Sequence, residues 1–274
     1  MAYTRPAGIS PSHRHAVEAL HRAGGPFTVA DAAKILDREV VGTRRLLAYL
    51  ARRGWLARVR RGMYIPVPLE ANLSGQWSAD PWVAASVAFA PCYIGGWTAL
   101  EHWGLTEQLF RTVVVISASP VRERAQDLQG IPVQIKVVAS RKMFGAVPVW
   151  RDQHKVDVSD PSRTLIDVLD DPSIGGGMNH VAGAVAEYFG SEQHRKDELL
   201  IDYGDRLGNK AVFKRLGYLI ETLRVDAPLL VEACKARRSA GISVLDPAVK
   251  SKGRILRRWG LRVNVDLAHV EAWS

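Results

Sequence analysis

Hydrophobic positions in the first quarter of the chain recur with helical spacing, and turn residues separate them into short segments. The pattern predicts helices over residues 10–22, 28–36 and 40–53. Thr28 and Asp31 form a T-x-x-D variant of the capping box at the start of the second helix. Only a tight turn separates the second helix from the third, which is the spacing of a helix-turn-helix.

The third helix has two faces of opposite character. Successive helical residues are turned by about 100°, so one face collects Leu46, Leu47, Leu50, Thr43 and Val40. We expect that face to pack inward. The opposite face collects Val41, Arg44, Arg45, Ala48 and Arg52. Arginines among small residues are typical of a recognition helix in the major groove of DNA, where a guanidinium can bond guanine or phosphate through two N–H groups.

A β-hairpin is expected directly after this helix. Residues 55–60 and 63–67 alternate like half-buried strands, and Gly62 can supply the positive φ of a tight turn. Helix–helix–helix–hairpin is the order of a winged helix, so we expect the hairpin's arginines to contact phosphate or the minor groove. These arginines are Arg58, Arg60 and Arg61.

The positive charge of the chain is concentrated in the same region. The 274 residues carry a net charge of +9, and residues 1–67 hold 12 Lys/Arg against 4 Asp/Glu. Residues 68–274 hold 25 against 24. Arginine-rich helices are often only solvated faces, but this asymmetry favours a separate basic module that binds double-stranded DNA.

The composition excludes several other classes of protein. Hydrophobic residues make up 47% of the chain and charged residues 24%, as in an ordinary globular protein. Cys92 and Cys234 cannot form a disulfide framework, and no Cys/His cluster predicts zinc. The sequence shows neither a signal peptide nor a membrane span, so a cytoplasmic location is expected.

The rest of the chain is expected to form a larger body. A polar linker, residues 69–79, separates the winged helix, residues 1–68, from the body, residues 80–274. Helices are predicted over 80–90, 160–169, 178–189, 196–207, 210–224 and 227–237. Strands are predicted over 112–118, 132–139, 146–150, 155–158 and 261–266. The fold class is therefore mixed α/β, an N-terminal winged helix-turn-helix followed by a larger mixed α/β domain.

Motifs for catalysis are absent from the sequence. It contains no GxxxxGK[ST], GxGxxG, HExxH or GxSxG, so no catalytic residue, cofactor or metal is predicted. Three weaker patterns are interpreted as ordinary structure. The triple glycine at 175–177 precedes a helix and could receive a phosphate, but it is interpreted as a loop. Cys92 and His102 are interpreted as a buried thiol near a surface histidine and not as a catalytic pair. The carboxylates Asp167, Asp170 and Asp171 could hold a metal, but they are interpreted as a solvated face.

Two further groups of residues in the body leave their roles open. A second basic stretch contains Lys252, Arg254, Arg257, Arg258 and Arg262. It fits a solvated face, a supplementary DNA contact, or a dock for an acidic toxin or its RNA substrate. The body's aromatic residues are most simply core, and they are Trp97, Trp103, Trp150, Tyr188 and Tyr218.

An ordered set of segments resembles a known family over nearly the whole chain. The segments are TVADAAKIL, GTRRLLAYLARRGWLARVRRGMYIPVP, YIGGWTALEHWGL, DPSRTLIDVLDDPSIGGGMNHV, KRLGYLIETL and RWGLRVNVDL. Together they resemble the AbiEi-type antitoxins of abortive-infection, type IV toxin–antitoxin systems and related transcriptional regulators. The resemblance implies a winged helix that represses its own operon, a C-terminal antitoxin domain and a nucleotidyltransferase-type toxin.

The resemblance also implies which residues contact operator DNA, which is expected to carry inverted repeats. By position, Thr43, Arg44 and Arg45 match the recognition helix. The residues that match the wing are Arg58, Arg60, Arg61 and Gly62.

Two other functions stay open at this point. A DNA-acting enzyme is one, because Asp127 and Lys136 weakly resemble the acid and lysine of nucleases, although a second firm acid is missing. A repressor that senses a small molecule in its body is the other, and an apolar pocket with a few polar groups would favour it.

Overall fold

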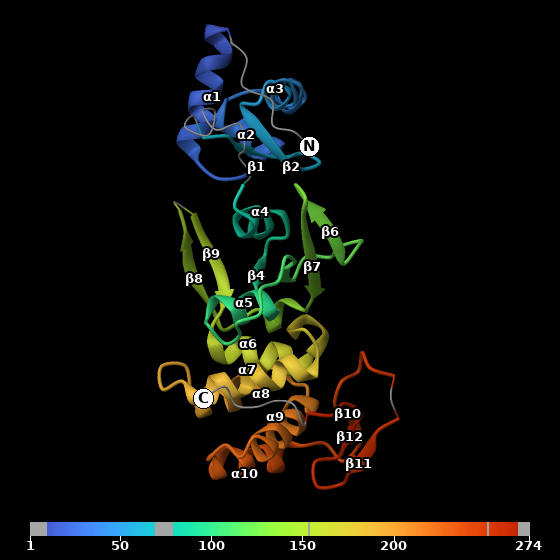
Figure 1. Ribbon diagram of the computed structural model, residues 1–274. Helices are drawn as coiled ribbons and strands as arrows, with labels where there is room; N and C mark the ends of the chain where they lie inside the picture. Colours follow the sequence, from blue (N-terminus) through green and yellow to red (C-terminus); the bar gives the residue numbers. More distant parts are fainter. Residues whose placement is uncertain (1–9, 69–78, 153, 251, 268–274) are drawn as a thin grey trace.

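The computed structural model describes residues 10–68, 79–152, 154–250 and 252–267. It confirms the mixed α/β class: a small winged helix sits at one end of a larger body that contains a six-stranded sheet, a layer of helices and a second small sheet (Figure 1). No helix within these described ranges has both the length and the apolar character needed to cross a membrane.

The N-terminal module has every element that the sequence predicts and one more. Its elements are α1 (Pro11–Ala23), β1 (Phe27–Thr28), α2 (Val29–Ile35), α3 (Val40–Arg52), β2 (Leu56–Arg60) and β3 (Met63–Pro66). The unpredicted strand β1 has two residues and pairs with β3, Phe27 opposite Tyr64. The order β1-β3-β2 completes the three-stranded sheet of a winged helix.

Local capping explains where these helices begin. The Ser10 hydroxyl accepts a bond from the amide of His13 at the start of α1. At α2 the predicted capping box is confirmed: Thr28 Oγ1 accepts from the amide of Asp31, and Asp31 accepts from the amide of Thr28 at 3.0 Å. These bonds satisfy backbone N–H groups that a helix leaves free in its first turn.

The body is built around a curled mixed sheet in the order β6-β7-β5-β4-β9-β8. The strands are β4 (Cys92–Ile94), β5 (Val113–Ser117), β6 (Ala125–Leu128), β7 (Ile131–Val137), β8 (Ala146–Arg151) and β9 (His154–Ser159). Helix α4 (Pro81–Ala88) lies between the β6–β7 and β8–β9 hairpins (Figure 1). Ile94 joins the core cluster on the α4 side, whereas its neighbour Tyr93 joins the cluster formed with the helices below.

Helices α5 (Gly96–His102) and α6 (Pro161–Asp170) contact the other face of the sheet. A layer of further helices packs against α6 and, beyond it, against one another: α7 (Met178–Gly190), α8 (Asp197–Leu207), α9 (Ala211–Thr222) and α10 (Pro228–Arg237). The small sheet follows, with β10 (Ser243–Val244), β11 (Arg254–Leu256) and β12 (Leu261–Val263). Trp259, which is fully buried, anchors the turn between β11 and β12 against Gly217 of α9.

One aromatic expectation is wrong. Trp150 is 63% exposed because it lies on the outer face of the edge strand β8, where the ammonium group of Lys155 approaches its ring at 4.8 Å. Tyr188 and Tyr218 are buried as expected, and Trp97 and Trp103 are half-buried against the core. An edge strand has one neighbour fewer, so its side chains can stay in solvent.

The wing and the body share a hydrophobic cluster. Val59, Met63 and Ile65 of the wing pack in one cluster with Val83 of α4 and Leu128 of β6. The predicted linker lies outside the described residues except for Ala79, which is buried. The division into residues 1–68 and 80–274 therefore stays a prediction, and an isolated winged helix would expose this apolar side of its wing.

Candidate nucleic-acid interface

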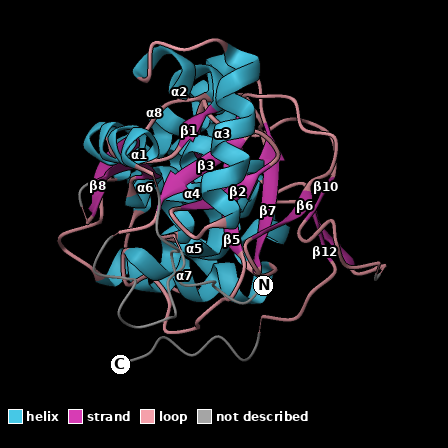
Figure 2. Cartoon of the chain, turned by 90° about the horizontal axis from the view of Figure 1, so that it is seen from above, coloured by secondary structure: helices cyan, strands magenta, loops and turns pink. Residues whose placement is uncertain are grey.

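The outer face of α3 is the strongest candidate for a nucleic-acid contact. Arg44, Arg45 and Arg52 are exposed, and Val41 beside them is 53% exposed. The opposite face holds the module in place through Leu46, Leu47 and Leu50, all buried. Viewed from above, α3 lies on the near side of the molecule with the body behind it (Figure 2).

Among the described residues, no carboxylate pairs with the arginines of this face. Within the described residues 10–68, the one ion pair joins His15 to Glu18 at 3.8 Å. The carboxylate of Asp31 is occupied by the capping box, and its pKa is lowered by the hydrogen bonds from the side chain and backbone of Thr28. The guanidinium groups of α3 are therefore available to phosphate or base edges.

Two residues of α3 differ from parts of the sequence analysis. The burial of Thr43 agrees with the helical period but not with the DNA contact that the resemblance implies, and Val40 is not on the inward face. Thr43 is fully buried, and its hydroxyl donates to the carbonyl of Glu39 at 2.9 Å, so its side chain has no surface to offer DNA. Its role is to fix the first turn of the helix. Val40, expected to pack inward, is 45% exposed, because α3 begins at this residue and its first turn extends beyond the core.

The wing turns at Arg61 and Gly62, and its three arginines have different surroundings. Gly62 has φ +79°, as the predicted turn requires, and its carbonyl accepts from the amide of Val29. The Arg58 Nε–H donates to the carbonyl of Arg60 at 3.4 Å. The guanidinium of Arg60 lies 5.7 Å from the ring centroid of Phe89 in the body. Arg61, exposed at the turn, is the freest of the three to meet a ligand.

Contacts with the body fix the position of the wing. The side-chain amide of Gln129, at the turn between β6 and β7, donates to the carbonyl of Arg58 at 3.2 Å. The imidazole of His154, from the β8–β9 hairpin, lies close to Gly25 in the loop after α1. The tips of both hairpins therefore contact the winged helix, and nothing in the sequence of either hairpin indicated this.

The nuclease-like pair is not assembled. The Asp127 carboxylate accepts from the amide of Gly130 in the β6–β7 turn, and its register partner is Pro132. Lys136 lies four residues further along β7, about 13 Å away along an extended strand, where its ammonium group binds Asp170 at 2.7 Å. Among the residues that the structure describes, no cluster of three or more His, Cys, Asp or Glu could hold a metal ion.

The carboxylates of α6 serve separate structural contacts. Asp167 is buried, pairs with Arg163 at 2.9 Å and accepts from the Tyr93 hydroxyl at 2.8 Å. Burial raises the pKa of Asp167, although Arg163 opposes the shift. Asp171 caps the short 3₁₀ helix that follows, Pro172–Gly175, by accepting from the Ser173 amide. These carboxylates are therefore not the solvated face that was expected.

The triple glycine leads to a helix whose N-terminus is already occupied. The Met178 amide, at the start of α7, donates to the carboxylate of Asp246 at 2.9 Å. Since a carboxylate of the chain itself fills this position, a phosphate has no place there. The triple glycine is therefore part of the loop between the short 3₁₀ helix and α7.

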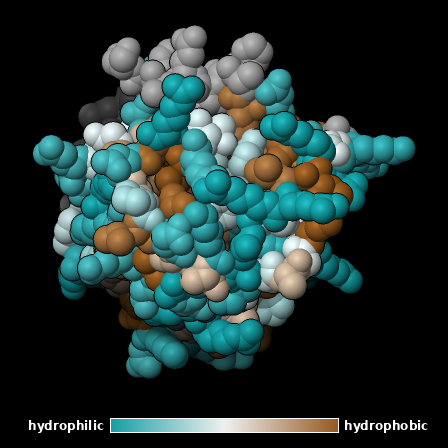
Figure 3. Space-filling view, turned by 90° about the horizontal axis from the view of Figure 1, so that it is seen from below, coloured by the Kyte–Doolittle hydropathy of each residue, from teal (hydrophilic) through white to brown (hydrophobic). Residues whose placement is uncertain are grey.

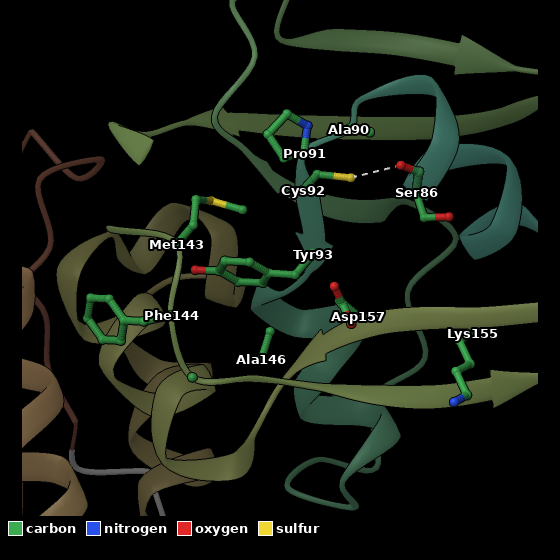
Figure 4. Close-up of a pocket in the computed structure, with 11 residues that line it drawn as sticks. Ser86, Ala90, Pro91, Cys92, Tyr93, Met143, Phe144, Ala146, Lys155 and Asp157 are labelled. Carbon is green, nitrogen blue, oxygen red and sulfur yellow. Dashed lines mark hydrogen bonds between the residues drawn. The ribbon is translucent and has the colours of Figure 1, made fainter. Parts of the chain in front are cut away.

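A cavity of about 650 Å³ opens beside the start of β4 (Figure 4). Its lining includes Pro91 and Cys92, the aromatic ring of Phe144, and the opposite charges of Lys155 and Asp157. The Cys92 thiol donates to the carbonyl of Ser86 at 3.2 Å, and burial, followed by the charge of Asp157, raises its pKa to about 12. The thiol therefore stays protonated near neutral pH and is no nucleophile.

His102 is not a partner of that thiol. Its ring packs against Trp82 at 5.3 Å and Trp103 at 4.5 Å, between centroids. Burial, followed by the charge of Arg151, lowers its pKa. The Cys92–His102 pair is therefore structural, as expected.

A family of known proteins matches the winged helix. Residues 15–67 match the family described as transcriptional regulator, AbiEi antitoxin, which confirms the resemblance for the winged helix. No curated protein gives a significant match to the chain. The crystal structure of the RV2827C protein from Mycobacterium tuberculosis is similar, with a TM-score of 0.62 and 16% identity, covering 95% of this chain and 94% of that one. At this identity the likeness shows a shared fold alone.

Proposed function

With residues 15–67 forming a regulator module of the AbiEi type, we propose that this protein is a DNA-binding antitoxin. Its winged helix represses its own toxin–antitoxin operon, and its body counteracts a nucleotidyltransferase-type toxin. The observation that carries the proposal is the outer face of α3, where Arg44, Arg45 and Arg52 are exposed without a carboxylate partner among the described residues.

The geometry of α3 supports a division of roles among these arginines. Arg44 and Arg45 lie in the first half of the helix, the part that approaches base edges when a recognition helix enters the major groove. Exposed Val41, one turn earlier than Arg45, adds an aliphatic surface of the kind that contacts a thymine methyl group. Arg52 and the wing arginines, further from the helix start, suit the phosphate backbone.

Binding of the full chain to DNA from its own promoter tests the first half of the proposal. We expect specific binding that weakens steeply with salt, because neutralised phosphates release counterions. Arg44→Ala/Arg45→Ala should abolish operator preference, whereas Arg111→Ala, an exposed arginine of the body, should leave it unchanged. Equal losses in both variants would point to charge alone and refute the role of α3.

The contacts found in the body support a protein without catalytic activity on nucleic acids. Asp127 and Lys136 are held apart, each by a structural partner. Incubation of labelled duplex DNA with the pure protein and Mg²⁺ or Mn²⁺ should give no nicking. Nicking that Asp127→Asn abolishes would instead establish the enzyme alternative.

The cavity beside β4 supports a second candidate function, a repressor that responds to a small molecule. Ser86 and Ala90, at the end of α4, line the cavity, and α4 packs against the wing. A ligand in this cavity would therefore change how the wing packs against the body. A library compound that raises the melting temperature and alters operator affinity, with both effects lost in Ala146→Phe, would support this function.

A further inference from the structure

The C-terminal small sheet carries a concentration of positive charge separate from the winged helix. Residues 237–262 contain eight Lys/Arg and a single acidic residue, Asp246. Asp246 is 2% exposed, and its carboxylate accepts from the amides of Met178 and Ala248, both at 2.9 Å. Because this carboxylate is buried and hydrogen-bonded within the fold, residues 237–262 present mainly cations to solvent.

Five of these cations form what we call the far-end patch. None of the five has a carboxylate partner among the described residues, whereas their neighbours Arg237 and Arg258 pair with Asp205 and Glu221. Four of the five are exposed and Arg262 is half-buried. The patch consists of Lys250, Lys252, Arg254, Arg257 and Arg262.

Strand pairing and a buried tryptophan hold the small sheet that carries the patch against the core. In the β11–β12 pair, Leu256 and Leu261 are opposite each other and face the core, so the next pair, Ile255 and Arg262, faces outward. The indole N–H of Trp259, in the turn between the strands, donates to Glu221 at 2.7 Å.

A buried lysine of α9 supports the loop before β10 and the turn before β12. The Lys214 ammonium group donates to the carbonyl of Gly241 and approaches Ser243 Oγ at 3.3 Å. Burial, followed by the charge of Arg238, lowers the pKa of Lys214.

We propose that the far-end patch is a second, sequence-independent contact for the phosphate backbone of double-stranded DNA. Dense Lys and Arg without carboxylate partners are typical of surfaces that bind nucleic acid, whereas the centres of protein–protein interfaces are depleted of Lys. The one aromatic side chain of residues 237–262, Trp259, is fully buried, so the surface offers no ring on which single-stranded bases could stack.

The small sheet that carries the patch lies far from the winged helix (Figure 1). The face of the molecule seen from below, at the end away from the winged helix, is mostly hydrophilic, with separate hydrophobic areas among the polar residues (Figure 3). The small sheet and α3 lie in different parts of the molecule, separated by the six-stranded sheet and its helices (Figure 1). One molecule would therefore hold two duplex segments at once, one on each site.

A bridging experiment with the full chain tests the proposal. Operator duplex on beads is saturated with protein, and capture of a second, labelled duplex of random sequence, about 30 base pairs long, is measured at several salt concentrations. We expect Lys252→Ala/Arg254→Ala/Arg257→Ala to reduce capture at least tenfold and to lower the salt slope by about three units. The matched triple Arg111→Ala/Arg122→Ala/Arg141→Ala removes the same charge elsewhere and should stay within about twofold of the wild type.

Each other outcome overturns the proposal. Unchanged capture by the patch variant would mean that two winged helices do the bridging. Equal losses in both triples would mean that only net charge matters. A patch variant that still captures DNA but no longer binds poly-L-glutamate would assign the surface to an acidic polypeptide. If α3 itself does not bind DNA, the wild type still binds one duplex and the patch variant loses it, so the two proposals fail separately.

Discussion

The role of an arginine in this molecule depends on what its side chain contacts. Arg163 is fully buried, donates to the Tyr93 hydroxyl at 2.8 Å and stacks on Phe144 at 4.0 Å, so it is part of the core. Arg44 is exposed and has no carboxylate partner in the described part of the chain. Composition counts both as equal contributions to a basic protein, but only the second can meet a polyanion.

Two helical glycines offer a paired test of packing. A Cβ on Gly217 would overlap the ring of Trp259, whereas a Cβ on Gly183 in α7 has nothing within 4 Å. We expect Gly217→Ala to lower the free energy of unfolding by about 1–3 kcal/mol, since a well-packed core resists an added methyl group. Gly183→Ala should be neutral or stabilising by up to about 1 kcal/mol. Urea denaturation measures both, and equal effects would contradict the packing of Trp259 under α9.

Asp170 gives the stability a defined pH dependence. Burial acts to raise its pKa, but the charge and hydrogen bond of Lys136 and the amide of Asn209 outweigh burial, so its pKa lies below the usual value. Such a group stabilises the fold above its unfolded-state pKa of about 3.9, and the benefit is lost as pH falls through the lower folded-state pKa.

Asp170→Asn should therefore cost about 1–3 kcal/mol at pH 7, and the difference from the wild type should shrink below about pH 4. Urea unfolding of both proteins between pH 7 and pH 3 measures this difference in stability. A cost that does not change with pH would mean that shape, and not charge, sets the contribution of this side chain.

At the scale of elements, the sequence predicts best what local signals define. The three helices, the arginine-rich hairpin and the four longer strands of the body lie where periodicity and capping residues place them. β1 was missed because its two residues become a strand only by pairing with β3. β6, Ala125–Leu128, was missed because it is mostly exposed and lacks an alternating apolar pattern.

Candidate sites follow the same rule. The face of α3 was predictable because helical period alone determines it. The separation of Asp127 from Lys136 and the contact of Arg60 with Phe89 were not, because both depend on strand register and on packing between distant segments.

Helix and wing should therefore contribute differently to DNA recognition. Arg44→Ala or Arg45→Ala should cost about 1–3 kcal/mol at the operator and lower the ratio of operator to random-DNA affinity. Arg61→Ala should weaken both affinities alike and reduce the salt slope by about one unit. Arg60→Ala should have a smaller effect than Arg61→Ala, because Arg60 lies against Phe89.

Titrations of the four variants on operator and scrambled duplexes at two salt concentrations separate these effects. Loss of discrimination in the wing variants alone would mean that the protein reads DNA through its wing, for example by the width of a minor groove.

At the scale of the whole molecule, the body does more than follow the winged helix along the chain. Val83 and Leu128 of the body pack against the wing, and the side-chain amide of Gln129 donates a hydrogen bond to it. His154 lies close to the loop after α1. The body therefore sets the orientation in which α3 is presented. The outer face of α3 itself makes none of these contacts, so its arginines can be changed without disturbing the packing of the wing against the body.

This arrangement predicts that repression and toxin neutralisation can be separated in one full-length variant. Arg44→Ala/Arg45→Ala removes two exposed side chains that support no packing, so the fold and the body should persist. A reporter driven by the operon's own promoter should be derepressed in this variant to the level seen without the protein. Growth of cells that express the nucleotidyltransferase-type toxin from an unrelated promoter should be rescued as well as by the wild type.

Protein levels and melting temperature serve as controls, because a destabilised variant would lose both activities for a trivial reason. If the variant is folded and abundant yet fails to rescue growth, neutralisation requires the DNA-binding face. The body would then not be the antitoxin element that we propose. Rescue of growth together with full derepression would place the two activities on separate surfaces of one chain, which are connected through the packing of the wing against the body.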